Sequence, residues 1–265
     1  MKSGFKIAIG GKGGVGKTTI SAVLAQLLAQ DGFDVLAVDA DPDANLCAAF
    51  GLMPNECPEP LINMKTLIGE RTGTGKEAVG VYFKLNPKVS DLPEKHWHTV
   101  DGVKLLAMGG IEQAGSGCAC AKGSFLKALL THTMLQRKEV VVVDLDAGVE
   151  CMGRASILGI DALIIVVEPG SRSIETATNI ANMSKDLGVK LVAVIVNKLT
   201  SAAQLDVIKE KLQLPVLTSL DYSPSVQQAD LEREGVFQSD PNVVRRMTEA
   251  KQALIELMQT AQAQA

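Results

Sequence analysis

A glycine-rich loop near the start of this chain limits its possible folds more than any other feature. The loop lies between an apolar run at 6–10 and a helix-like stretch at 18–30, and it reads Gly11-Lys12-Gly13-Gly14-Val15-Gly16-Lys17-Thr18. Glycines let backbone N–H groups turn inward around phosphate oxygens, and a helix that begins here directs its positive end at the same place. This order of strand, loop and helix is what a phosphate-binding loop requires. It predicts a P-loop site for Mg-ATP.

Residues of the loop have separate predicted roles. Lys17 is expected to reach the β- and γ-phosphates, and the Thr18 hydroxyl is expected to ligate Mg²⁺. Thr19 is its neighbour in the first helical turn. The residues of this region that we expect to bind ATP are Gly13, Gly14, Val15, Gly16, Lys17, Thr18 and Thr19.

The rest of the chain alternates between strand-like and helix-like stretches. Several short β-branched runs are apolar without alternation, which is typical of strands buried on both faces of a parallel sheet. The runs are 6–10, 35–39, 103–108, 140–144, 163–167, 191–196 and 216–220. Apolar residues make up 46% of the chain and aromatic residues 3%, so the core must be aliphatic. We expect a doubly wound, mostly parallel α/β sheet with helices on both faces and ligands at the carboxyl ends of its strands.

One domain is expected to span residues 1–265, with an insertion at about 45–102. The insertion is rich in proline and interrupts the alternation of strands and helices. It contains His96 and His98, for which an ordinary surface position is favoured over a metal site. The five cysteines, in a chain without a recognisable signal peptide, favour reduced thiols or metal ligands over disulfides. Cys47 and Cys57 are expected to be structural thiols.

Charge and hydropathy exclude several classes of partner. The net charge is −4 and no basic stripe is present, which argues against a nucleic-acid partner. No apolar run is long enough to cross a membrane, and the amphipathic tail at 243–265 is expected to pack on the sheet rather than on a membrane. We therefore expect a cytoplasmic protein that does not insert into membranes.

Two acidic segments follow strand-like runs and complete the predicted nucleotide site. Asp144 lies at the end of one run, where a carboxylate can hold Mg²⁺ through a water molecule. Asp41 follows another and is our candidate for orienting the water that attacks the γ-phosphate. Capping of the next turn or helix is the alternative role for such aspartates.

These residues resemble the deviant Walker A motif of the ATPase family that includes MinD, ParA and the nitrogenase iron protein. The mark of that motif is a second lysine early in the loop, which is Lys12 here. The resemblance implies a homodimer in which Lys12 reaches the partner's nucleotide and takes part in catalysis with Lys17 and Asp41. It also implies adenine contacts from Asn197, Lys198 and Pro224, three further residues expected to bind ATP or ADP.

A cysteine pair lies in the glycine-rich segment Gly115-Ser116-Gly117-Cys118-Ala119-Cys120. Two thiolates alone leave a metal shell half filled, whereas a two-fold dimer supplies four. The chain resembles the CooC/AcsF branch in this pair and in three further stretches, Met108-Gly109-Gly110-Ile111-Glu112, Gly148-Val149-Glu150 and Val167-Glu168-Pro169. That branch assists nickel insertion into carbon monoxide dehydrogenase and acetyl-CoA synthase. That resemblance implies Ni²⁺ or Zn²⁺ held by Cys118 and Cys120 of both subunits, and carbon monoxide dehydrogenase as the client. A pair of small buried thiols is the alternative.

Two other functions stay open at this point. Cys118 and Cys151 could hold a [4Fe–4S] cluster across a dimer, as a nitrogenase iron protein-like reductase would. A positioning ATPase of the MinD or ParA kind would need a membrane helix or a DNA-binding surface, and the sequence offers neither convincingly.

Overall fold

A computed structural model describes residues 4–41, 43–74, 84–109, 119–136, 139–145 and 159–263 of the chain. Within these ranges eight strands form one sheet in the order β3-β4-β2-β5-β1-β6-β7-β8. Neighbouring strands are parallel except for β3, which runs antiparallel to β4 at one edge. The strands are β1 (Lys6–Gly11), β2 (Val35–Asp39), β3 (His98–Val100), β4 (Val103–Ala107), β5 (Val140–Asp144), β6 (Ala162–Val167), β7 (Leu191–Leu199) and β8 (Val216–Asp221).

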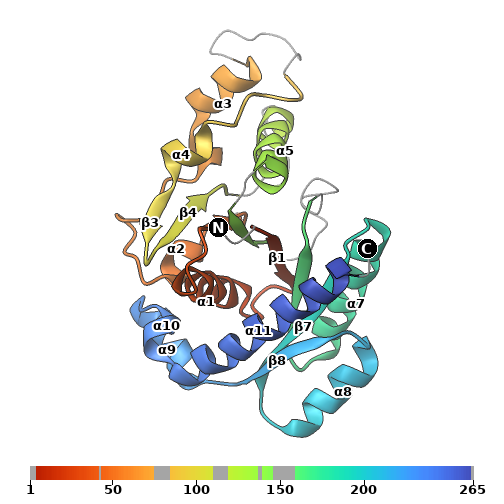
Figure 1. Ribbon diagram of the computed structural model, residues 1–265. Coiled ribbons are helices and arrows are strands. Elements are labelled where there is room, and N and C mark those ends of the chain that lie inside the picture. Colours follow the sequence, from red (N-terminus) through yellow and green to blue (C-terminus); the bar gives the residue numbers. More distant parts are fainter. Residues whose placement is uncertain are drawn as a thin grey trace.

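Helices cover both faces of this sheet, which makes a three-layer α/β/α arrangement (Figure 1). One face packs against α1 (Lys17–Gln30), α2 (Leu46–Ala49), α9 (Pro224–Glu232), α10 (Val236–Ser239) and α11 (Pro241–Ala263). The other face packs against α3 (Lys65–Thr72), α4 (Leu92–His96), α5 (Ala119–Gln136), α7 (Ser171–Asp186) and α8 (Ala202–Leu212), with the short 3₁₀ turn η1 (Leu61–Asn63) nearby. The predicted doubly wound, mostly parallel fold is confirmed.

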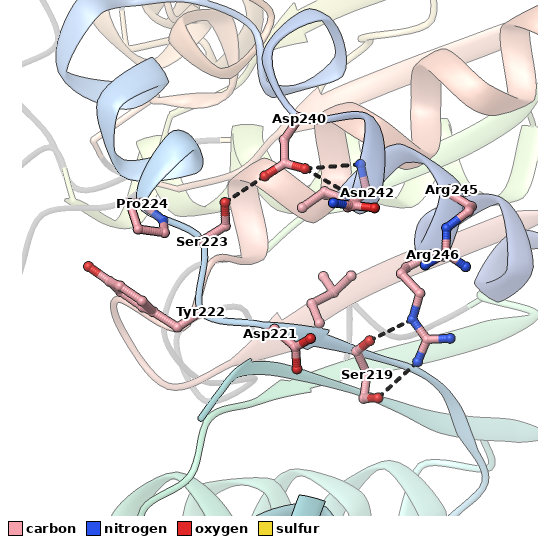
Figure 2. A pocket seen from close by; sticks show the side chains of 11 residues that line it. Ser219, Asp221, Tyr222, Ser223, Pro224, Asp240, Asn242, Arg245 and Arg246 are labelled. Carbon is pink, nitrogen blue, oxygen red and sulfur yellow. Dashed lines mark hydrogen bonds between the residues drawn. The ribbon is translucent and has the colours of Figure 1, made fainter. Parts of the chain in front are cut away.

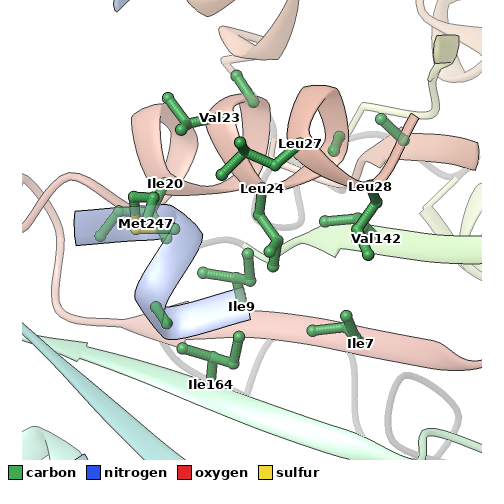
Figure 3. Close-up of a cluster of buried hydrophobic side chains, with 14 of the residues drawn as sticks. Ile7, Ile9, Ile20, Val23, Leu24, Leu27, Leu28, Val142, Ile164 and Met247 are labelled. Carbon is green, nitrogen blue, oxygen red and sulfur yellow. The ribbon is translucent and has the colours of Figure 1, made fainter. Parts of the chain in front are cut away.

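The two layers of core follow from alternation along the central strands. Ile7 and Ile9 of β1 point towards α1, whereas Ala8 between them points to the opposite face. Successive side chains of a strand face opposite sides, so a strand covered on both sides must be apolar throughout. On the first face, Leu24 and Leu28 of α1 lie over the sheet, and both are at most 1% exposed (Figure 3).

The stretch between β2 and β4 is more regular than its proline content suggested. It holds α2, η1, α3, α4 and the short edge strand β3. His96 ends α4 and His98 begins β3, so both belong to secondary structure rather than to the expected surface loop.

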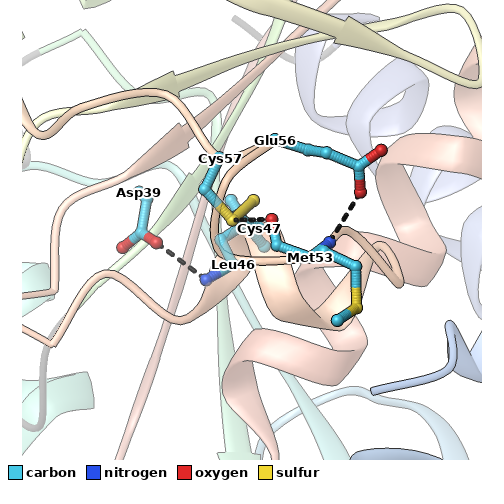
Figure 4. The surroundings of a disulfide bond; sticks show 6 residues. All are labelled: Asp39, Leu46, Cys47, Met53, Glu56 and Cys57. Carbon is cyan, nitrogen blue, oxygen red and sulfur yellow. Dashed lines mark hydrogen bonds between the residues drawn. A yellow bond between two sulfur atoms is a disulfide. The ribbon is translucent and has the colours of Figure 1, made fainter.

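Cys47 and Cys57 form a disulfide, so the expectation that they are free structural thiols is wrong (Figure 4). Cys47 lies in α2, and the chain reverses after that helix at Gly51, whose φ is +81°. The turn brings the two Cα atoms to 5.7 Å from each other, a separation that a disulfide can bridge. Cysteine count and compartment could not reveal a proximity that depends on this local turn.

The core on the first face predicts a clear contrast between two leucines. Leu24→Ala should lower the free energy of unfolding by about 2–5 kcal/mol, because it removes buried apolar atoms and leaves a cavity. Leu231→Ala on α9 is the matched control, since Leu231 is 78% exposed, and it should change stability by less than about 0.5 kcal/mol. Urea unfolding of both variants measures the difference. Equal effects would contradict the assigned packing of α1.

Candidate functional site

The glycine-rich loop joins β1 to α1 at the carboxyl edge of the sheet. Gly14 and Gly16 have φ values of +79° and +97°, a region that side chains with a Cβ rarely adopt. A Cβ at Gly16 would lie 2.5 Å from Nδ2 of Asn197, so a larger residue would also displace that side chain. The loop backbone and the N-terminus of α1 therefore have the form of a phosphate cradle.

Asn197 and Lys198 of β7 donate hydrogen bonds to the backbone of this loop. The Asn197 amide donates from Nδ2 to the carbonyl of Val15 at 2.8 Å, and its Oδ1 accepts the Lys198 N–H at 2.9 Å. Lys198 has a left-handed φ of +59°, and its ammonium donates to the carbonyl of Gly14. The adenine contacts expected from Asn197 and Lys198 stay a prediction, but both residues touch the loop.

The two lysines of the loop have different surroundings. Lys17 is 7% exposed, and its ammonium lies 3.4 Å from the carbonyl oxygen of Lys12. It therefore curls back over the loop, where phosphates are expected. Lys12 is more exposed, and its ammonium lies 3.3 Å from Oε1 of Glu168, the residue that follows β6.

Asp144 at the end of β5 is buried beside the start of α1. Its Oδ1 accepts a hydrogen bond from Ser21 at 3.1 Å, whereas Oδ2 has no hydrogen-bond partner within the described ranges. Burial raises the pKa of Asp144 to about 6, against the opposing effects of the Thr18 and Ser21 hydroxyls and the Lys17 ammonium. A buried carboxylate oxygen beside the Thr18 hydroxyl suits Mg²⁺, which is bound by oxygen ligands. The residues present thus fit the expected Mg²⁺ site.

Asp39 is a second buried carboxylate, and it stands opposite Asp144 in the β2–β5 ladder. Burial, together with the charge of Asp144, raises the pKa of Asp39 to about 7. Its oxygens accept the N–H groups of Leu46 at 2.7 Å and Asp41 at 3.1 Å. Asp39 therefore anchors the segment that carries Asp41.

Asp41 lies close to both buried carboxylates, since its charge contributes to the raised pKa values of Asp39 and Asp144. Its own Oδ1 accepts the N–H of Asp43 at 3.0 Å. The aspartate predicted to orient water is thus near the predicted Mg²⁺ ligand, and its catalytic role stays a prediction.

Pro224 lines a pocket of about 470 Å³ between the end of β8 and the start of α11 (Figure 2). Arg246 closes one side, where its guanidinium donates to the backbone and side-chain oxygens of Ser219 at 3.0 Å each. On the other side Asp240 accepts hydrogen bonds from Ser223 and from the first N–H groups of α11. The polar walls suit a base or ribose, and the adenine contact of Pro224 stays a prediction.

The predicted metal cysteines are not covered by these observations. Cys118 and Cys151 lie outside the described residues, and Cys120 falls in the first turn of α5 without a described side chain. Within the described part of the chain, no cluster of three or more His, Cys, Asp or Glu residues could hold a metal ion. In the same ranges no helix is both long and apolar enough to span a membrane.

Residues 6–236 match the model of the CobQ/CobB/MinD/ParA nucleotide binding domain. The chain belongs to this family. It is a CooC-like member, 44% identical over 229 residues to the carbon monoxide dehydrogenase accessory protein CooC of Rhodospirillum rubrum, with 85% of this chain and 87% of CooC covered. It is also 43% identical over 225 residues to an uncharacterised ATP-binding protein of Methanocaldococcus jannaschii, with 84% and 87% covered.

A solved structure supports the fold of this family independently. The septum site-determining protein MinD of Pyrococcus horikoshii, in complex with Mg-ADP, superimposes with a TM-score of 0.71 at 18% identity and covers 97% of this chain and 98% of its own. At that identity the likeness concerns the fold alone. The predicted family and fold class are confirmed.

Glu168 and Asp39 contribute to the site, although the sequence predicted no individual role for either residue. Glu168 belongs to the stretch Val167-Glu168-Pro169, which carries part of the resemblance to the CooC/AcsF branch, and Asp39 is the first of three closely spaced aspartates. Their positions at the ends of β6 and β2, beside the loop strand and beside Asp144, give them their importance.

The raised pKa values predict an unusual dependence of stability on pH. In the folded protein Asp39 and Asp144 keep their protons at pH values where the unfolded chain has lost them. The resulting stabilisation is complete below about pH 4 and is lost as the pH rises to about 7. The Asp39→Asn variant lacks one of these groups. As the pH rises from about 4 to about 7, the free energy of unfolding of the variant should therefore increase relative to that of the unaltered protein, by up to about 1.4 kcal/mol per pH unit.

Urea unfolding with EDTA and without nucleotide, from pH 4 to 8, measures this difference. Asp206→Asn on α8 alters an exposed carboxylate and is the control. A stability difference for Asp39→Asn that is constant with pH would contradict the protonation assigned to Asp39.

Proposed function

We propose that this protein is an ATP-hydrolysing metallochaperone that dimerises with ATP and assists nickel insertion into carbon monoxide dehydrogenase. In this proposal Cys118 and Cys120 of two subunits bind one Ni²⁺ or Zn²⁺ ion as cargo. The observation that carries the proposal is the 44% identity to CooC over 85% of the chain. The phosphate cradle formed by the glycine-rich loop supports the ATPase part of the proposal.

The loop and its neighbours account for nucleotide chemistry through position and charge. The N–H groups of 13–18 and the Lys17 ammonium hold the phosphates, and Thr18 with Asp144 holds Mg²⁺. When bound, Mg²⁺ neutralises charge on the β- and γ-phosphates. Asp41 orients the water whose oxygen bonds to the γ-phosphorus as the bond to the ADP oxygen breaks. The products are ADP and phosphate.

The energy of ATP binding is coupled to the cargo through the dimer. Lys12 stands at the rim of the loop with 38% of its side chain exposed, whereas Lys17 is buried within it. A rim position suits a lysine that reaches the partner's phosphates. Closing the dimer also brings together two Cys118–Cys120 pairs, which complete a four-thiolate shell.

Alanine substitutions of the two loop lysines should have different effects on nucleotide binding and dimerisation. Lys17→Ala should lower the ATP hydrolysis rate about a hundredfold or more, because it removes the charge beside the phosphates. Lys12→Ala should still bind nucleotide as a monomer but lose ATP-driven dimerisation and hydrolysis. Lys185→Ala, an exposed position on α7, is the control. Sedimentation with Mg-ATP and a phosphate-release assay test both, and an unchanged dimer fraction in Lys12→Ala would refute its cross-subunit role.

The cargo site predicts one Ni²⁺ or Zn²⁺ ion per dimer. Cys118→Ser and Cys120→Ser should each abolish that stoichiometric binding, and Cys151→Ser should leave it intact. Affinity should weaken as the pH falls, because thiolates must replace thiols. Metal analysis after dialysis against Ni²⁺ or Zn²⁺ measures the content.

Two results of the metal analysis would contradict the shared site. One ion per monomer that survives in Cys120→Ser would exclude a four-thiolate shell. Iron near four per dimer that requires Cys118 and Cys151 would favour the iron–sulfur reductase instead.

A further inference from the structure

The carboxylate of Glu168 joins two lysines at the rim of the nucleotide loop. Its Oε1 lies 3.3 Å from the Lys12 ammonium, and its Oε2 lies 3.4 Å from the Lys198 ammonium. Each oxygen thus faces one lysine. Lys198 in turn donates to the carbonyl of Gly14 within the loop. Glu168 therefore connects β6, β7 and the loop by charge.

The backbone fixes where this carboxylate stands. Gly11 pairs with Val166 in the parallel β1–β6 ladder, so Lys12 and Glu168 leave neighbouring strands at the same edge. The Glu168 N–H donates to the hydroxyl of Ser173 at 3.1 Å, and Ser173 is 2% exposed in α7. This hydrogen bond fixes the main chain from which the Glu168 side chain extends, and the ion pair with Lys198 still holds the carboxylate when Lys12 leaves.

The ion pairs of Glu168 are weak enough to release a lysine. The side chains of Lys12, Glu168 and Lys198 are 38%, 24% and 40% exposed. Ion pairs with this exposure are screened by water and contribute little individually. A γ-phosphate carries more negative charge than one carboxylate, so it can displace Glu168 as the partner of a lysine.

We propose that Glu168 is a positioning residue that retains Lys12 in its own subunit and gives it up when ATP brings two subunits together. Lys198, which also holds Gly14, stays with Glu168 throughout. This inference rests on the cross-subunit role proposed for Lys12. When Lys12 moves to a partner's phosphate it gives up the ion pair with its own Glu168, so loss of this pair opposes dimerisation until nucleotide is present.

Cross-linking with a water-soluble carbodiimide tests the retention directly, because it joins only amines and carboxylates in contact. In nucleotide-free protein, mass spectrometry should find both Lys12–Glu168 and Lys198–Glu168 peptides. A non-hydrolysable ATP analogue with Mg²⁺ should lower the yield of the Lys12 peptide severalfold and leave the Lys198 peptide unchanged. ADP, which lacks the γ-phosphate, should leave both. The Lys198–Glu168 peptide is an internal control. If the role of Glu168 were purely structural, the yields of the two peptides would not differ in their response to the nucleotide.

Glu168→Gln tests the consequence for assembly. The variant removes the charge and keeps the shape, so the dissociation constant of the dimer with the ATP analogue should fall about threefold to tenfold, the range for two exposed ion pairs per dimer. Glu175→Gln, exposed on α7, is the matched control and should leave the constant unchanged.

Three results would overturn the inference: no Lys12–Glu168 peptide in free protein, equal yield of that peptide in the ATP-analogue dimer, or dimerisation of Glu168→Gln that is no tighter. If the unaltered protein does not dimerise when the ATP analogue is added, the proposed function is overturned. The inferred release of Lys12 is then overturned as well. Sedimentation of the unaltered protein, measured first, distinguishes that case from the other three.

Discussion

The parallel hydrogen-bonded ladder that holds β1 between β5 and β6 is the constraint on which the rest of this site depends. It pairs Ile9 with Asp144 on one side and Gly11 with Val166 on the other. Gly11 has a φ of +147°, and a Cβ on this residue would lie 2.5 Å from the Val166 carbonyl oxygen. This register brings the loop, Asp144 and Glu168 to one edge of the sheet, although they are far apart in the sequence.

Like charges lie close together at this edge of the sheet. Asp39 and Asp144 are both about 1% exposed and stand opposite each other, and their raised pKa values reflect that cost. On the rim, Lys12 and Lys198 share one carboxylate. In the proposed function, Mg²⁺ supplies positive charge beside the two carboxylates and nucleotide phosphates supply negative charge beside the two lysines. Under the proposed function, binding of Mg-ATP stabilises an edge that is unfavourable by itself.

Much of the fold and part of the site could be predicted because they depend on local patterns. The glycine loop, the apolar strands and Asp144 each carry a signal within a few residues. The edge strand β3 was missed because two of its three residues are half-buried, the third is exposed, and they follow a short proline-containing helix. The Cys47–Cys57 disulfide and the contacts of Glu168 arise from a turn and from strand register, which no local pattern encodes. The roles of Cys118 and Cys120 stay predictions.

The central claim is that this edge binds Mg-ATP and that Lys12 then serves a second subunit. An experimental structure with Mg²⁺ and a non-hydrolysable ATP analogue tests it most directly. The account predicts phosphates within residues 13–18, Mg²⁺ between the Thr18 hydroxyl and Asp144, and Lys12 at the γ-phosphate of the partner subunit. A nucleotide bound elsewhere, or a loaded monomer with Lys12 still on its own Glu168, would contradict it.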